Sequence, residues 1–184
     1  MFQELLAKLA AELNSRKIPY MIIGGQAVLL YGEPRLTKDI DITLGIDTDR
    51  ATDVLACADR LGLKILVENP NEFICSTMVL PVQDAATGIR VDFIFSYSPY
   101  EQQAIARAKQ MNLAGSILRF ASVEDLIIHK IIAGRPRDLE DVKGILLKNK
   151  NLDTNYILRW LKDFGIGLEK DFLGCFETIL KELK

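Results

Sequence analysis

The apolar positions of the first forty-four residues switch between helical and strand spacing. Residues 2–16 repeat leucines on one stripe, which predicts an amphipathic helix. A short apolar run at 20–23 predicts a strand that ends at Gly24-Gly25, and residues 26–31 predict a helix. Residues 39–44 alternate strictly between polar and apolar side chains, which is typical of a strand. The chain therefore begins as helix, strand, glycine turn, helix and strand.

The next segments continue this mixture of helices and strands. Residues 49–61 predict a helix. Two strands are expected at 73–82 and 90–95, and the turn residues 84–88 between them predict a hairpin. An edge strand is expected at 117–120.

From residue 100 onward, apart from that edge strand, the chain is predicted to be mainly helical. Ser122 is a good N-cap for a helix over 123–133, which Gly134 ends. Three more helices are expected, with Gly165 and Gly167 separating the last two: 138–147, 154–164 and 168–183.

This order predicts an α/β (α+β) fold, in which a part that mixes strands and helices is followed by helices. We expect residues 1–121 to form the α/β core and residues 122–184 a C-terminal helical region packed on that core. With 184 residues, of which 49% are hydrophobic, the chain has enough apolar material for an ordinary core.

Composition excludes several functional classes. A net charge of -2 gives no global basic field, so strong general nucleic-acid binding is not expected. Three dispersed cysteines and one histidine make a disulfide framework or a structural zinc site improbable. The N-terminus mixes acids with apolar residues, unlike a signal peptide, and no apolar run is long enough to cross a bilayer. We therefore expect a cytoplasmic protein without a membrane partner.

Three aspartates on predicted strands are the first candidate for chemistry. Asp39 and Asp41 share one side of their strand, and Asp92 lies on the side of its strand opposite Val91 and Phe93. If these strands are neighbours, three carboxylates converge. Such like charges are stable mainly around a divalent cation, for which Mg²⁺ is the first candidate and Mn²⁺ a possible substitute. The alternative is that the acids are the solvated face of an edge strand.

The glycine turn before these acids is the second candidate. Gly24-Gly25 precedes a helix whose first N–H groups can bind an anion, and a residue without Cβ lets phosphate approach the backbone. The alternative is an ordinary tight turn.

Together these residues resemble the DNA polymerase β-like nucleotidyltransferase superfamily. The motif consists of Ile23-Gly24-Gly25, thirteen intervening residues, Asp39-Ile40-Asp41-Ile42, and later Val91-Asp92-Phe93-Ile94. The resemblance implies a small mixed β-sheet of the nucleotidyltransferase type, flanked by helices. It also implies transfer of an NMP from an NTP to an acceptor hydroxyl, with release of pyrophosphate. It assigns metal binding and catalysis to Asp39, Asp41 and Asp92, and nucleotide binding to Gly24, Gly25 and Gln26.

A second resemblance is to AbiEii-type toxin-like nucleotidyltransferases. The segment from Arg35 to Asp41 is similar to their R-x-T-x-D-x-D motif, and Lys130 followed by Arg135-Pro136-Arg137-Asp138 and Asp141 is similar to their later lysine and R-x-[KR]-D motifs. This resemblance implies a toxin-antitoxin component with an antitoxin partner. Arg35 and Thr37 would then bind the nucleotide, or would only shape their loop.

Lys130 is unusual on its own terms, because its helical spacing places it with Leu126 and Ile127 on an apolar stripe. A buried ammonium needs a partner. In the functional interpretation Lys130 and Arg135 bind the triphosphate, while Asp138, counted with Lys130 as catalytic, positions them or orients the acceptor. The alternative is a lysine at the rim of the core and an acid-rich helix start.

The sequence thus predicts a Mg²⁺-dependent nucleotidyltransferase that uses an NTP, with ATP as one candidate. It does not select the acceptor among tRNA, a protein and a small molecule. One alternative is a catalytically inactive nucleotide-binding or interaction protein of the same fold. Another is a phosphatase-like or nuclease metal site, although a triphosphate explains the glycine turn better.

Overall fold

The computed structural model describes residues 2–113 and 115–183. Contacts divide the chain into two compact units, which we call the first unit (residues up to 26 together with 36–121) and the second unit (residues 27–35 together with those from 122 onward). Residues 27–35, expected in the α/β core, group with the later helices.

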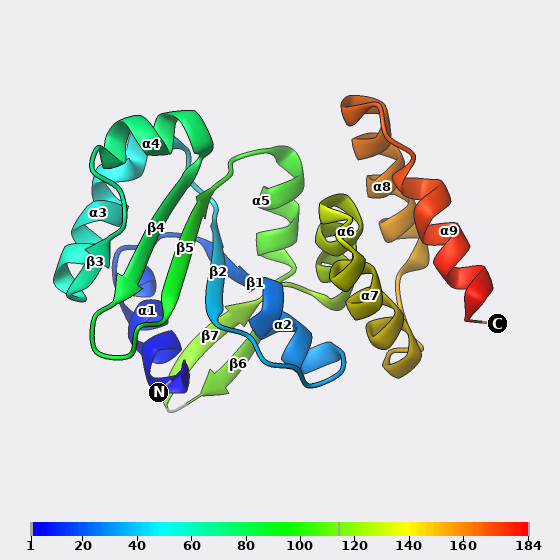
Figure 1. Cartoon of the computed structure of the whole chain (residues 1–184), viewed down its shortest axis with the longest axis horizontal. Coiled ribbons are helices and arrows are strands. Elements are labelled where there is room, and N and C mark those ends of the chain that lie inside the picture. The colour runs from blue at the N-terminus through cyan, green and yellow to red at the C-terminus, as the bar shows by residue number, and fades with distance from the viewer. Residues whose placement is uncertain (1, 114, 184) are drawn as a thin grey trace. The chain divides into compact units, whose positions relative to one another are not determined.

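The first unit contains a seven-stranded mixed sheet in the described part of the chain (Figure 1). Its strand order is β3-β4-β5-β2-β1-β7-β6. The β2–β5 and β1–β7 pairs are parallel and the other pairs are antiparallel. The strands are β1 (Tyr20–Ile23), β2 (Asp39–Leu44), β3 (Leu63–Ile65), β4 (Val79–Asp84), β5 (Arg90–Phe95), β6 (Lys109–Leu113) and β7 (Ser116–Phe120).

Helices of the first unit pack on individual strands of this sheet: α1 contacts β7, α3 contacts β3, α4 contacts β4 and α5 contacts β1. Helix α2 begins in the first unit and continues into the second. The bounds are α1 (Phe2–Ser15), α2 (Gly24–Tyr31), α3 (Ala51–Arg60), α4 (Pro70–Thr77) and α5 (Pro99–Ala106), with a 3₁₀ turn at Thr48–Arg50.

The register between β2 and β5 is set by their apolar side chains. The parallel pairing places Ile40 beside Val91, Ile42 beside Phe93 and Leu44 beside Phe95. All six side chains are buried. Because side chains alternate between the faces of a strand, a slip of one residue would expose this entire set, so the core fixes the pairing.

Among its described residues the second unit contains four further helices: α6 (Val123–Ala133), α7 (Pro136–Lys148), α8 (Thr154–Leu168) and α9 (Phe172–Glu182). Helix α6 packs against each of the other three. Its start is capped by Ser122, whose hydroxyl accepts from the N–H of Asp125. The Tyr156 hydroxyl donates to Asp125 Oδ1 at 2.7 Å and ties α8 to α6.

The predicted fold class is confirmed: a mixed sheet is flanked by helices and followed by helices. The predicted hairpin of the strand at 90–95 with the strand before it is also present, as β4 and β5 pair antiparallel. No helix in the described ranges has the length and apolar character needed to cross a bilayer.

The predicted strand at 73–82 is wrong in its first half, where the chain forms α4. Pro70 occupies the first turn of this helix, where its missing N–H is not needed, and only Ile74 of the helix is buried. Met78 ends the helix in the left-handed conformation with φ 60°, and β4 starts at the next residue. A short apolar run does not distinguish a helix from a strand by periodicity alone.

The prediction that 117–120 is an edge strand is also wrong, because β7 lies between β1 and β6. Strand β6 forms the edge. Its sequence, Lys-Gln-Met-Asn-Leu, is almost entirely exposed and therefore lacks the apolar alternation that identifies a strand.

Gly165 and Gly167 do not break the last helices, because both lie inside α8. The helix ends instead at Leu168, and Glu169 follows it in the left-handed conformation with φ 53°. Gly167 meets no atom within 4 Å of a Cβ position, so this part of the helix faces open space and tolerates glycine at a cost of about 1 kcal/mol.

Candidate active site

The three predicted aspartates lie on one face of two neighbouring strands. The parallel register pairs Asp41 with Asp92 and pairs Asp39 with Arg90. Residues paired in this way share a face, and it is the face opposite the apolar core residues. Asp39 is exposed, whereas Asp41 and Asp92 are half-buried. Further along the same face of β2, Thr43 is buried, so the acids occupy the open end of this surface.

Gly24 touches the acid face directly. Its φ is +63°, and a Cβ added there would lie 1.9 Å from Asp41 Oδ2. Only glycine therefore allows the start of α2 to approach the Asp41 carboxylate this closely. Gly25 and the buried Gln26 follow in the first turn of α2, whose leading N–H groups have no partner within the helix.

Arg90 is the cation among these acids. Its Nε donates to Asp92 Oδ1 at 2.9 Å, and the side chains of Arg90 and Asp92 are 50% and 19% exposed. The pKa of the Arg90 guanidinium is raised, first by this hydrogen bond and then by the charges of Asp92, Asp39 and Asp41, which together outweigh desolvation. The predicted site residues did not include Arg90, although the alternation over 90–95 already placed it on the face of Asp92.

The donor set fits a hard divalent cation, since three carboxylates on one surface supply the oxygen ligands that Mg²⁺ prefers. In the described ranges, however, no three His, Cys, Asp or Glu side chains form a group that could hold a metal ion as they stand. Asp39, Asp41 and Asp92 are the carboxylates from which such ligands would come, and Asp92 is engaged with Arg90.

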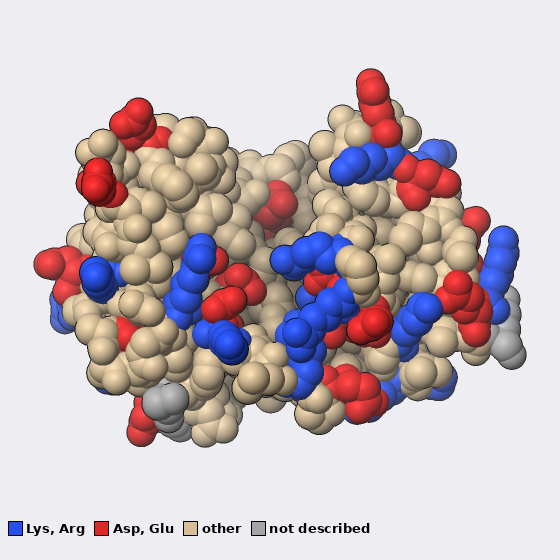
Figure 2. All heavy atoms as spheres, viewed as in Figure 1, with Lys and Arg blue, Asp and Glu red and all other residues tan. Residues whose placement is uncertain are grey.

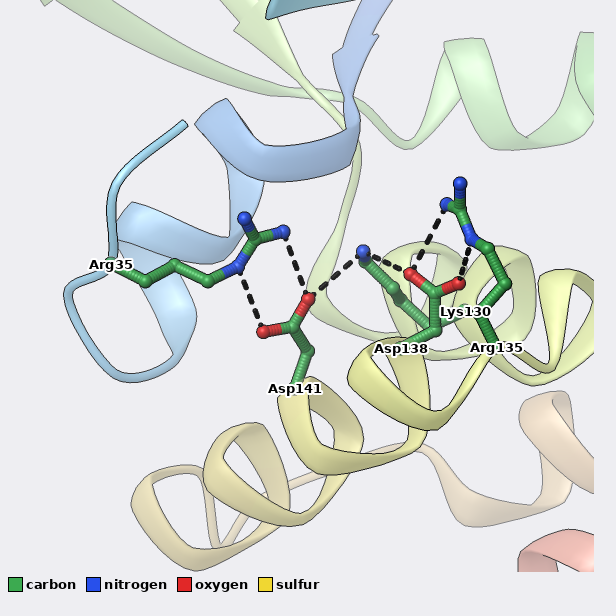
Figure 3. Close-up of polar contacts among 5 residues, drawn as sticks. All are labelled: Arg35, Lys130, Arg135, Asp138 and Asp141. Atoms are coloured by element: carbon green, nitrogen blue, oxygen red, sulfur yellow. Dashed lines mark hydrogen bonds and ion pairs between the residues drawn. The ribbon is translucent and has the colours of Figure 1, made fainter. Parts of the chain in front are cut away.

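A second set of charged residues, which we call the charge ladder, lies within the second unit (Figure 3). Lys130 Nζ on α6 is 2.6 Å from Asp138 Oδ1 and 2.9 Å from Asp141 Oδ2, both on α7. Arg35, in the loop after α2, donates to Asp141 twice at 3.0 Å. Arg135 Nε lies 2.5 Å from Asp138 Oδ2. The ladder thus alternates basic and acidic groups across three segments of the chain.

Burial differs sharply along the ladder. The side chains of Lys130, Asp138 and Asp141 are at most 7% exposed, whereas that of Arg135 is 75% exposed. Burial raises the pKa of Asp138, but hydrogen bonds from Arg135 and Lys130 and their charges outweigh it, so the net pKa is lowered from 3.8. Lys130 was predicted to need a partner if buried, and the structure gives it two carboxylates, those of Asp138 and Asp141.

The remaining predicted nucleotide-binding residues lie in the segment before β2. The Thr37 hydroxyl donates to the backbone carbonyl of Asp39 at 3.3 Å, a contact that shapes the loop. Arg35 is held by Asp141 in the second unit, beside a cavity of ≈ 590 Å³ that Glu33, Arg137 and Glu140 also line. Asp141 was recognised in the sequence only as part of a motif, and its bidentate contact with Arg35 is visible only in the structure.

Comparison with protein families gives a match over residues 2–164. The matching model is described as "Nucleotidyltransferase of unknown function (DUF6036)". A search of the curated proteins gives no match.

Solved structures share this fold at low sequence identity. The solution structure of the antibiotic-resistance factor ANT(2'')-Ia matches with a TM-score of 0.56 and 18% identity, covering 98% of this chain and 94% of that chain. A crystal structure of ANT(2'')-Ia in complex with adenylyl-2''-tobramycin matches with 0.55 and 21%, covering 79% and 87%. An antigenic nucleotidyltransferase-like protein from Paracoccidioides brasiliensis matches with 0.56 and 18%, covering 92% and 91%. At these identities the likeness shows the fold alone.

Proposed function

The chain belongs to the nucleotidyltransferase family DUF6036 and fits the DNA polymerase β-like superfamily, and from this premise we propose that it transfers an NMP from an NTP to an acceptor hydroxyl with Mg²⁺ at Asp39, Asp41 and Asp92. One observation carries the proposal. The β2–β5 register sets Asp41 beside Asp92 on the face where Gly24 meets Asp41, so a glycine-led helix start and paired carboxylates share one surface.

In the proposed reaction the acceptor oxygen attacks the α-phosphorus of the NTP. An O–P bond forms, the bond to the leaving pyrophosphate breaks, and the hydroxyl proton moves toward Asp92. The first N–H groups of α2, at Gly25 and Gln26, bind phosphate oxygens. Mg²⁺ or Mn²⁺, when bound, supplies charge neutralisation at the phosphates.

For the second unit by itself we propose that Arg135 and Lys130 bind phosphate oxygens and that Asp138 positions both. Arg135 has the exposure that ligand contact requires, and Asp138 bonds to both cations. Arg35 holds the loop before β2 through its two hydrogen bonds to Asp141, and Thr37 holds it through its hydrogen bond to Asp39.

The test is incubation of the full chain with each labelled NTP, Mg²⁺ and a cell lysate, in parallel with tRNA and with an aminoglycoside. Transfer of label and release of pyrophosphate are expected, and Asp41→Asn should abolish both. Asp59→Asn, which changes an exposed acid on α3, is the matched control and should remain active. NTP binding without any product would favour an inactive nucleotide-binding protein. Activity that persists in Asp41→Asn would overturn the proposal.

The acceptor and any antitoxin partner are finer proposals on the same site. The aminoglycoside arm follows from the adenylyl-2''-tobramycin complex of ANT(2'')-Ia, and the tRNA arm and the proteins of the lysate keep the other acceptor classes in the test. If the chain is a toxin, its expression should slow growth and Asp41→Asn should relieve that effect.

A further inference from the structure

Arg90 occupies a defined place in a row across the sheet. The registers align Lys64 on β3, Gln83 on β4, Arg90 on β5 and Asp39 on β2, so these four side chains share the face of the acids. Arg90 is therefore flanked by Asp39 across the strand pair and by Asp92 two positions along its own strand. It is the basic residue that this register places directly against the aspartates.

The contact that Arg90 makes involves a carboxylate needed for metal binding. Asp92 Oδ1 accepts from the Arg90 Nε at 2.9 Å. In the part of the chain that the structure describes, the acids do not form a three-ligand group as they stand. A guanidinium and a divalent cation both seek the same negative oxygens, so occupation of Asp92 by one opposes its occupation by the other.

We propose that Arg90 is a positioning residue that holds Asp92 in the metal-free protein and gives it up to the incoming divalent cation. This inference rests on the proposed function, because it concerns the same metal site. Arg90 offsets the repulsion between Asp92 and Asp41, its neighbour in the register. The same contact weakens cation binding, since the ion must displace a charged hydrogen bond.

The test is a calorimetric titration of the full chain with Mn²⁺ alone, without nucleotide. Arg90→Ala should bind Mn²⁺ about fivefold more tightly than wild type, the scale expected from loss of one partly exposed ion pair. Arg90→Lys restores a competing charge and should bring the affinity back toward wild type. Lys64→Ala is the control: it removes the same charge from the same face, but from β3, which lies two strands or roughly 10 Å from β5. It should change the Mn²⁺ affinity less than about twofold.

The outcomes distinguish failure of this inference from failure of the proposed function on which it rests. If wild type and Asp41→Asn bind Mn²⁺ equally, or neither binds it, the metal site itself is overturned. If wild type binds, Asp41→Asn does not, and Arg90→Ala binds no more tightly than wild type, only the role of Arg90 is overturned. Tighter binding cannot result from damaged folding, and Arg90→Gln provides a second variant should Arg90→Ala fail to fold.

Discussion

At the scale of single residues, the approach of Gly24 to Asp41 is the tightest constraint on the acid face. A Cβ at this position would overlap Asp41 Oδ2, and φ is also unfavourable for any other residue. Gly24→Ala should therefore lower the free energy of unfolding by at least about 2 kcal/mol and weaken Mn²⁺ binding. Urea denaturation and calorimetry measure the two effects.

Gly62 offers a matched control for this substitution. Its φ is +65°, close to that of Gly24, but a Cβ there meets no atom within 4 Å. Gly62→Ala should cost only about 1 kcal/mol, from backbone strain alone, and leave Mn²⁺ affinity unchanged. Equal losses in the two variants would show that Asp41 does not constrain position 24.

Residue types and alternation were enough to predict the acid face, but not its contacts. The period of two along 39–44 and 90–95 predicted which side chains share a surface, and the register confirms that geometry. The ion pair of Arg90 with Asp92 could not be predicted, because alternation gives the face of a side chain and not its rotamer. The roles assigned to these residues stay predictions until they are tested.

At the scale of elements, Lys130 joins α6 to α7 through two buried carboxylates. Lys130→Met should leave Asp138 and Asp141 without this partner and cost about 3–5 kcal/mol. Lys143→Met is the control, since Lys143 on α7 pairs with Glu182 while 42% exposed and should cost at most about 1 kcal/mol. Thermal and urea unfolding of both variants measure the two losses of stability. Similar losses would contradict a special role for the buried ion pairs of Lys130.

The contact between α6 and α7 also predicts that the stability of the protein depends on pH. The folded-state pKa of Asp138 is lowered from 3.8, so its contribution to stability is present above that value and is lost as pH falls through the lower folded pKa. Because the hydrogen bond from Arg135 is the first cause that lowers this pKa, Arg135→Ala should shift the loss to higher pH. Unfolding midpoints between about pH 2 and pH 5 measure the shift. An unchanged profile would mean that Arg135 does not act on Asp138.

Elements with a strong apolar period were predicted well and short or polar ones were not. Helix α4 buries only Ile74, so its sequence carries almost no helical stripe. Strand β6 is exposed and is defined by its pairing with β7, for instance Met111 with Leu118. Such elements depend on contacts with a neighbouring element, which the apolar period of their own residues does not show.

At the scale of the whole molecule, charge is spread rather than concentrated. Figure 2 shows acidic and basic side chains intermixed over the face in view, in keeping with a net charge of -2. No large field of one sign would steer a polyanion to this face.

The three cysteines give a probe of global opening. Burial raises the pKa of Cys57 on α3 to about 12, whereas Cys75 is exposed. In a chain with Cys75→Ser and Cys175→Ser, a thiol reagent at pH 8 should react with Cys57 only as fast as the first unit opens, because a buried, protonated thiol is a poor nucleophile. The rate should rise steeply with urea. Rapid reaction in native buffer would contradict this protection.

The place of residues 27–35 in the second unit could not be predicted from local pattern. Residues 27–35 group with the second unit, where Lys148 Nζ donates to the Gly32 carbonyl at 2.9 Å and Asn149 Nδ2 donates to that of Tyr31 at 2.8 Å. These contacts join positions more than one hundred residues apart. Strand order has the same origin, since periodicity identifies strands but not their neighbours.

The β2–β5 register also bears on how this chain tolerates changes in length. Insertions at the turn residues 85–88 leave every pairing of β5 intact, whereas one added residue between Val91 and Phe93 would turn part of the strand over and bury a carboxylate or expose a phenyl ring. Homologues should therefore vary in length in the turn between β4 and β5 and not within either strand. An alignment that opens a gap inside 90–95 would place the wrong residue opposite Asp41.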